Sequence, residues 1–403
     1  MTNSICRGGK LIMTQSRQVS DNLPSYLCQH VQDNKPDRFP LRIASAYKIG
    51  LHLASLQAYL RDGWTIPVTL ELDLTTACNR ACPHCATIKR PPSMELSWDL
   101  ADRLLQTLGG KTKGLLLAGG EPTISPIFIR VVSEGHASGF EQIAVVTNGS
   151  TLQEPHITSA MVEHVSAIRI SIGHSTASAY AQAFGCDEKE FKHALQGIER
   201  LRCATDANNS SLQIGVSALT CSTNVSRLSN MAEQARSAGA HWVYFHPLCL
   251  GWCTDTPYTA DQTGVFEELQ HLSSERLDDF QVYFFEERYK DTCLSIAFDF
   301  CHAAHFLLVV GADGCNYLTP DTKYMMDYMV HNFEYDWRTH FTSYGPRLDR
   351  IRSITDKSLL NIRTRNRGAL YSTLIQQIVS GKAHPTKLNH RASQLGIGWE
   401  HIL

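Results

Sequence analysis

Between residues 65 and 250, six short apolar segments alternate with amphipathic ones, and this alternation constrains the fold more than any other feature of the sequence. The six segments are Val68–Leu74, Gly114–Ala118, Gln142–Thr147, Ala167–Ile172, Leu212–Leu219 and Trp242–Leu248. Several are almost continuously apolar, as strands are when both faces of a parallel sheet are covered. Six strand–helix units are too few to close an eight-stranded barrel. The pattern therefore predicts an α/β fold, a partial (β/α)6 TIM-like barrel of parallel strands, with its site at the C-terminal strand ends.

Helix signals fall between the predicted strands. Ser97 precedes a segment with apolar residues at helical spacing, and Asp187 with Glu190 forms a capping-box pattern. Asn224 begins a third predicted helix, which ends near Gly239. These helices are expected to cover the sheet.

The rhythm changes after residue 250. Gln281–Phe285 and Ala303–Val310 are predicted strands, and Asp313-Gly314 is a turn signal between Leu307–Val310 and Cys315–Leu318. This predicts a small α+β C-terminal extension. The expected organisation is an N-terminal arm with helices at 1–64, the partial barrel at 65–250, and the extension with C-terminal helices at 251–403.

Composition excludes several classes of protein. The chain has 37 Lys and Arg against 39 Asp and Glu, so no net basic field would attract nucleic acid or an anionic membrane. The longest clean apolar run, Phe306 to Val310, is far shorter than the roughly 20 residues of a membrane span. No secretory signal is visible, and 13 cysteines, an odd number, argue against a disulfide scaffold. A cytoplasmic enzyme is expected.

Three cysteines form the motif that most directly indicates chemistry. Cys78, Cys82 and Cys85 follow the first strand as CxxxCxxC. An iron–sulfur cube normally takes four protein ligands, so three thiolates leave one iron open for a substrate or cofactor. The alternative is a zinc-binding or buried loop, but His84 is poorly placed as a fourth zinc ligand because Pro83 and Cys85 flank it.

A second motif ends the next strand. Gly119-Gly120-Glu121-Pro122 combines two glycines, which let the backbone pass close to a ligand, with a proline that fixes the turn. Glu121 offers a carboxylate to a cationic group. Such a turn alone is weak evidence, but it comes one strand–helix unit after CxxxCxxC.

Together these motifs resemble the radical S-adenosylmethionine (radical SAM) family. Thr147-Asn148-Gly149 after the third strand and Ser171 at the end of the fourth also match, and the resemblance spans roughly residues 65–250. In that family the three cysteines hold a [4Fe–4S] cluster, and the amino and carboxylate groups of S-adenosylmethionine chelate the fourth iron. The resemblance therefore implies Cys78, Cys82 and Cys85 as cluster ligands.

The resemblance also implies a cofactor-binding set around the cluster. The GGEP turn would line the methionine amino group, His84 would contribute to the adenine pocket, and polar residues at strand ends would reach the ribose or carboxylate. The residues implied are His84, Gly119, Gly120, Glu121, Pro122, Asn148, Ser171 and Ser217. Asn148 can also be read as a turn former, and His174 either as a substrate-side group or as an ordinary loop histidine.

The cysteines of the extension are similar to those of a twitch or SPASM-type appendage. Cys293, Cys301 and Cys315 would then hold an auxiliary [4Fe–4S] cluster, with Cys249 or Cys253 as a possible fourth ligand. The alternative is an appendage that has kept its shape without the metal. Cys249 and Cys253 are also candidates for a catalytic thiol that returns a hydrogen atom. Candidate acid/base groups flank the extension: Glu286, Glu287, Asp299, His302 and His305.

The implied reaction is reductive cleavage of S-adenosylmethionine to a 5′-deoxyadenosyl radical that abstracts a substrate hydrogen atom. The substrate would be a peptide or specialised metabolite modified by oxidation, cross-linking or epimerisation. An alternative is redox-neutral dehydration, deamination or epimerisation of a sugar or nucleotide, and a third reading is a non-catalytic iron–sulfur electron carrier or redox sensor. An external one-electron donor such as flavodoxin or ferredoxin is expected as a partner, with neither nucleic acid nor a membrane.

Overall fold

The computed structural model describes residues 46–85, 92–250, 258–274, 280–284, 289, 298–333, 345–354, 367–394 and 401–403. Four residues singled out from the sequence lie outside these ranges: Cys253, Glu286, Glu287 and Cys293.

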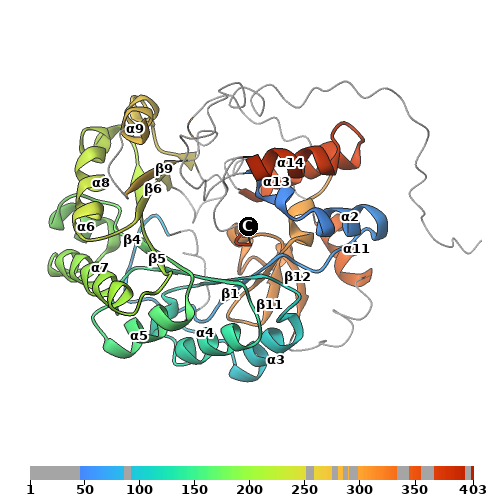
Figure 1. The fold of residues 1–403 in the computed structure, drawn as a ribbon, viewed down its shortest axis with the longest axis horizontal. Helices are drawn as coiled ribbons and strands as arrows, with labels where there is room; N and C mark the ends of the chain where they lie inside the picture. The colour runs from blue at the N-terminus through green and yellow to red at the C-terminus, as the bar shows by residue number, and fades with distance from the viewer. Residues whose placement is uncertain are drawn as a thin grey trace, which may run out of the picture.

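Ten strands of the described residues form one sheet, in the order β12-β11-β10-β1-β2-β3-β4-β5-β6-β9 (Figure 1). The six central strands run parallel to one another. They are β1 (Thr69–Asp73), β2 (Gly114–Ala118), β3 (Gln142–Thr147), β4 (Ala167–Ser171), β5 (Gln213–Thr220) and β6 (Trp242–Pro247). Their limits fall within one residue of those predicted, and the parallel α/β architecture of a partial barrel is confirmed.

The extension adds strands to this same sheet. β10 (Leu307–Val310) pairs in parallel with β1, and β9 (Gln281–Phe284) pairs in parallel with β6. β11 (Cys315–Tyr317) and β12 (Met329–Asn332) continue it as antiparallel strands, and Gly314 has φ +74° in the predicted turn before β11. A short separate pair consists of β7 (Cys249–Leu250) and β8 (Tyr258–Thr259). The predicted strand Ala303–Val310 begins late, because the 3-10 helix η6 (His302–His305) occupies its first residues.

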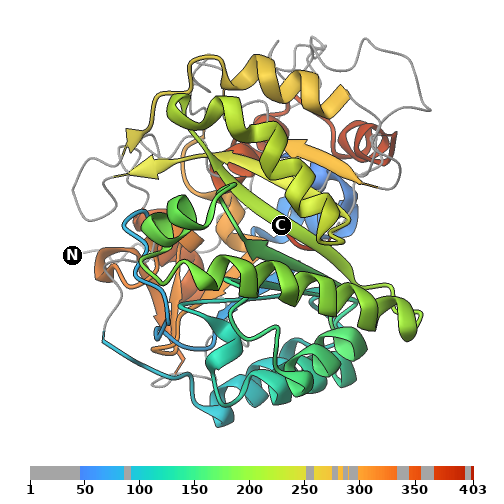
Figure 2. The ribbon, with the colours of Figure 1, turned by 90° about the vertical axis from the view of Figure 1, so that its left-hand side faces the viewer.

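Helices cover the outer face of the central strands, a layer that Figure 2 shows from outside. They are α3 (Trp98–Leu108), α4 (Phe128–Ala137), α5 (Pro155–His164), α6 (Ala177–Phe184), α7 (Lys189–Ala207), α8 (Leu228–Ser237) and α9 (Val265–Ser274). Side chains alternate between the two faces of each strand, and Leu70 on β1, Leu117 on β2 and Ile168 on β4 lie on the face that these helices cover. All three are fully buried in the core there. Short 3-10 helices, η3 (Pro122–Ile124) and η4 (Ser222–Arg227), precede α4 and α8.

The helix starts show which local signals decided the structure. Ser97 caps α3 as predicted, its hydroxyl accepting from the Leu100 N–H at 3.3 Å. The capping box predicted from Asp187 is not formed, because Glu190 pairs instead with Arg80. Asn224 lies within η4, so that α8 begins later, at Leu228.

The remaining elements gather beside β10 around a second hydrophobic core. They are η2 (Ala46–Leu51), α2 (Leu53–Asp62), η6, η7 (Pro320–Thr322), η8 (Met326–Tyr328), α11 (Gly345–Ser353), α13 (Arg367–Val379) and α14 (Pro385–Gln394). Residues 401–403 lie inside the curve of the sheet (Figure 1), where the Thr69 hydroxyl donates to the His401 carbonyl at 2.6 Å and Lys48 donates to that of Ile402 at 2.8 Å. They cover the N-terminal strand ends, so the C-terminal ends form the opposite mouth.

Candidate active site

The loop that carries Cys78, Cys82 and Cys85 follows β1 at this C-terminal mouth. All three thiols are partly exposed. Burial, with the neighbouring charges of Cys85 and Cys78, raises the pKa of Cys82 to about 12. Cys78 and Cys85 are thus close enough to Cys82 to act on its thiol, and neighbouring cysteine sulfurs are the ligands that iron–sulfur clusters take. This donor set fits an iron–sulfur cluster.

Two helices fix the conformation of the loop. The Ala81 N–H donates to the carbonyl of Phe184, the last residue of α6, at 3.0 Å. Arg80, whose side chain is 5% exposed, pairs with Glu190 in the first turn of α7 at 2.9 Å. Gly185 has φ +60°, and a Cβ there would lie 2.7 Å from the Ala81 carbonyl oxygen. The α6–α7 junction is thus a platform that holds the middle of the loop.

The GGEP turn holds the start of the loop. The Gly120 N–H donates to the Thr75 carbonyl and the Glu121 N–H to the Ala77 carbonyl, both at 2.8 Å. A Cβ at Gly120 would overlap the Ala77 carbonyl, and one at Gly119, where φ is +119°, would lie 2.5 Å from the Thr75 oxygen. The glycines therefore permit close approach to the cysteine loop itself, whereas the sequence suggested approach to a ligand.

Glu121 is held by hydrogen bonds within the protein. Its side chain is buried and accepts four hydrogen bonds, from the Thr123 N–H (3.1 Å), the Thr123 hydroxyl (2.5 Å), the Thr147 hydroxyl (2.6 Å) and the Asn148 N–H (2.6 Å). Burial raises its pKa, and these hydrogen bonds oppose the rise. The carboxylate thus joins the ends of β2 and β3, and its expected contact with a cationic group stays a prediction.

His84 and His174 lie close enough to influence each other. Burial, and secondarily the charge of His174, lowers the pKa of His84 to about 4; burial and Arg227 lower the pKa of His174. The His84 ring also meets Phe184 edge to face, with centroids 5.8 Å apart. Two neutral imidazoles beside an aromatic ring are compatible with the predicted adenine pocket.

The structure aligns the two predicted serines at neighbouring strand ends. Ser171 on β4 and Ser217 on β5 are register partners, and Tyr244 is the partner of Ser217 on β6. The flanking residues Ile170 and Val216 belong to the core beneath the helices, so the serines alternate toward the inner side of the sheet.

A buried charge cluster at the end of β1 was missed from the sequence. The Lys323 ammonium lies 2.8 Å from Glu71 Oε1 and 2.7 Å from Asp73 Oδ1, and the Tyr324 hydroxyl donates to Asp73 Oδ2 at 2.7 Å. Burial alone would lower the pKa of Lys323, but the charges of Asp73 and Glu71 raise it above its usual range. Two acidic residues in a buried strand were the available signal; nothing in the sequence singled out Lys323.

Two of the predicted auxiliary ligands, Cys301 and Cys315, lie in the described residues, and the fold does not bring them together. Cys301 precedes η6 and is buried in the second core, whereas Cys315 lies beyond the other end of β10, where its carbonyl accepts from the Gly311 N–H. The strand β10, about 13 Å long, lies between their positions in the fold. Cys249 is partly exposed beyond β6.

The histidines proposed as acid/base groups lie at the wrong end of the sheet. His302 is fully buried between the Tyr59 hydroxyl and the Gln376 amide oxygen, at 2.7 Å from each. Asp299 and His305 flank it, and all three precede β10, on the side of the N-terminal end of β1. They therefore do not face the cysteine loop, and this interpretation was wrong.

No group of three or more His, Cys, Asp or Glu side chains in the described ranges forms a site for a single metal ion. In an iron–sulfur cube each cysteine binds a different iron, so the ligands are spaced more widely than around one ion. The thiols of the cysteine loop, which are neighbours but do not point at one common ion position, are therefore compatible with a cluster.

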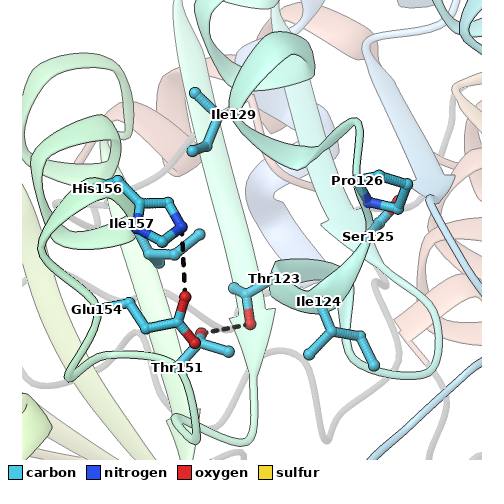
Figure 3. A pocket seen from close by; sticks show the side chains of 9 residues that line it. All are labelled: Thr123, Ile124, Ser125, Pro126, Ile129, Thr151, Glu154, His156 and Ile157. Atoms are coloured by element: carbon cyan, nitrogen blue, oxygen red, sulfur yellow. Dashed lines mark hydrogen bonds and ion pairs between the residues drawn. The ribbon is translucent and has the colours of Figure 1, made fainter.

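A pocket of about 350 Å³ lies behind the GGEP turn (Figure 3). Its floor includes Thr123 and Thr151, whose hydroxyls are 2.7 Å apart, and an exposed Glu154–His156 pair stands at its edge. Because the Thr123 hydroxyl also donates to Glu121, this pocket lies next to the hydrogen-bonded carboxylate that joins β2 and β3.

Among the helices of the described residues, none combines the length and apolar character that crossing a membrane requires.

Comparison with known proteins identifies the family. Residues 72–216 match the model of the Radical SAM superfamily. The chain is 30% identical over 150 residues to GTP 3′,8-cyclase of Synechococcus sp. (strain CC9902), covering 34% of this chain and 42% of that protein. It is 25% identical over 284 residues to the sporulation killing factor maturation protein SkfB of Bacillus subtilis (strain 168), covering 67% and 62%. The matched regions thus span less than two thirds of either relative.

The fold is similar to that of solved structures. SuiB of Streptococcus suis bound to S-adenosylmethionine superposes with a TM-score of 0.57 at 11% identity, covering 87% of this chain and 80% of that one. SuiB bound to its precursor peptide SuiA gives 0.54 at 11% identity, covering 74% and 69%. At such identities the likeness concerns the fold alone. Residues 72–216, which carry the cysteine loop and strands β2 to β4, therefore match the radical SAM superfamily of enzymes, as the cysteine spacing predicted.

Proposed function

We propose that this chain binds a [4Fe–4S] cluster through Cys78, Cys82 and Cys85 and uses it to cleave S-adenosylmethionine reductively. When bound, the cluster supplies one electron to the sulfonium, which yields methionine and a 5′-deoxyadenosyl radical that takes a hydrogen atom from a substrate. The observation that carries the proposal is the cysteine loop itself, whose backbone is held at the C-terminal end of β1 by hydrogen bonds to the GGEP turn and to the end of α6.

The residues around the loop would bind and orient the cosubstrate. His84 and His174, whose pKa values are both lowered by burial, would present ring nitrogens to an adenine. Ser171 and Ser217 would offer hydroxyls from adjacent strand ends to the ribose or carboxylate. Helices outside and residues 401–403 below close the barrel on two sides, which favours exclusion of water from its interior.

A peptide is the substrate class best supported. The sequence match to the sporulation killing factor maturation protein SkfB extends over 67% of this chain, whereas the cyclase match covers 34%. A nucleotide is the second candidate, because that cyclase has the highest identity of the relatives described. Mass spectrometry after anaerobic incubation with GTP, or with a precursor peptide encoded near the gene, would separate the two: a modified peptide supports the first class and a modified nucleotide the second.

We expect the reconstituted chain to form 5′-deoxyadenosine when it is reduced with dithionite in the presence of S-adenosylmethionine. Cys82→Ala should reduce this to background, whereas Cys203→Ala, at an exposed thiol, should leave it unchanged. Chromatographic detection of 5′-deoxyadenosine gives the result. If wild-type protein loaded with iron forms none, the enzyme proposal fails and an electron carrier or redox sensor replaces it. Iron content of about 4 atoms per chain would indicate one cluster, and about 8 an auxiliary one.

A further inference from the structure

The side chain of Asn148 lies against the first cysteine of the loop. Its amide nitrogen, Nδ2, is 3.8 Å from Cys78 Sγ, within the range of an N–H···S hydrogen bond, and only 8% of the residue is exposed. The sequence suggested that this side chain forms a turn or contacts a ribose.

Neighbouring groups fix which end of the amide faces the sulfur. The amide oxygen of Asn148 accepts from the Ser150 backbone N–H at 2.9 Å, and Nδ2 donates to the Asn79 side-chain oxygen at 2.8 Å. Asn79 in turn donates to the Ser150 hydroxyl at 2.8 Å. A flipped Asn148 would set its oxygen against the Asn79 oxygen and its NH₂ against the Ser150 N–H, so both bonds would be lost. The NH₂ group must therefore face Cys78.

The backbone at this position is equally constrained. The Asn148 N–H donates to Glu121 Oε2 at 2.6 Å, and the same carboxylate is held by Thr123 and Thr147. The buried carboxylate, the turn and the cysteine loop thus form one hydrogen-bonded unit. One hydrogen of the Asn148 NH₂ group points to Asn79 and the other is available to the Cys78 sulfur.

We propose that Asn148 is a positioning residue that raises the reduction potential of the cluster by donating a hydrogen bond to the Cys78 thiolate. The inference rests on the proposed function, since it assumes that Cys78 is a cluster ligand. A hydrogen bond to a ligating sulfur withdraws electron density from it, and so favours the reduced cluster, which carries one more negative charge. With its NH₂ group committed in this way, Asn148 does not donate to a ribose.

The test is a redox titration of the reconstituted holoprotein, followed by electron paramagnetic resonance. Asn148→Leu removes the donor while keeping the backbone N–H to Glu121, and Asn148→Asp keeps an acceptor for Ser150 while removing the donor. For both we expect a lower midpoint potential, by about 59 mV for a tenfold change in the one-electron equilibrium. Gln153→Ala alters the same loop, where its side chain donates to the His193 carbonyl at 3.0 Å, but leaves the N–H···S contact and should keep the wild-type potential.

The outcomes separate this inference from the proposed function. Wild-type midpoints in both Asn148 variants, at wild-type iron content, would overturn it. If one variant binds no iron, the other decides. If neither binds iron while Gln153→Ala does, Asn148 is needed for cluster assembly and the proposed effect on the reduction potential is wrong. Failure of the wild-type chain to bind a cluster would instead remove the proposed function.

Discussion

Replacing Gly120 with alanine is expected to prevent cluster loading. A Cβ at this position would overlap the carbonyl oxygen of Ala77, the residue just before Cys78. The overlap involves backbone, so it can be relieved only by moving the loop away from the GGEP turn, with loss of the hydrogen bonds to Thr75 and Ala77. Overpacking of about 1–3 kcal/mol corresponds to a loss of iron by a factor of about 5 to 150 at limiting supply. Iron content and absorbance after reconstitution would measure it.

Gly110→Ala is the matched control. Gly110 also has a positive φ, +69°, but a Cβ there would meet nothing within 4 Å. That variant should lose about 1 kcal/mol of stability from its backbone conformation and retain its iron. Wild-type iron content in Gly120→Ala would show that the GGEP turn does not shape the cysteine loop.

The largest effect on stability is expected for Lys323→Met. The substitution leaves Asp73 and Glu71 buried without their ammonium partner. Removing one partner of a buried ion pair lowers the free energy of unfolding by about 3–5 kcal/mol. Urea denaturation of the metal-free protein would measure the loss. Lys382→Met, at an exposed lysine for which no side-chain partner is seen among the described residues, should change the free energy of unfolding by less than about 0.5 kcal/mol.

The deficit of Lys323→Met should depend on pH. Burial raises the pKa of Asp73, and Lys323 opposes that rise, so removing Lys323 raises it further. A carboxyl whose pKa is higher in the folded than in the unfolded state stabilises the fold at low pH, and this contribution is lost as the pH rises through the folded value. The difference between variant and wild type should therefore be larger at pH 8 than at pH 5. A difference below 1 kcal/mol at both values would contradict a structural role for this cluster.

Local patterns were enough to predict the barrel. Gly114–Ala118 and Gln142–Thr147 were predicted without error, because buried parallel strands are continuous apolar runs with clear ends. The Ser97 cap was equally local. The pairing of Leu307–Val310 with β1 was not predictable in this way, because it joins segments more than 200 residues apart whose sequences carry no mark of each other.

The sequence predicted which residues form the site better than it predicted what each of them contacts. Cys78, the GGEP turn and Asn148 do lie together, and the support that the turn gives the cysteine loop was not predicted, while its expected contact with a ligand stays a prediction. Sequence motifs give residue types in order, whereas the hydrogen-bond partners of Glu121 depend on how β2 and β3 meet in space. The same limit applies to Cys301 and Cys315, whose spacing suggested a shared cluster and whose positions are at opposite ends of β10.

The central claim is that Cys78, Cys82 and Cys85 hold a cluster with one iron left for S-adenosylmethionine. Electron paramagnetic resonance of the reduced, reconstituted protein, recorded with and without S-adenosylmethionine, tests it most directly. The account predicts a [4Fe–4S] signal that changes its g values when S-adenosylmethionine is added and is missing when all three cysteines are replaced by alanine. A signal unaffected by S-adenosylmethionine, or one retained by the triple variant, would contradict it.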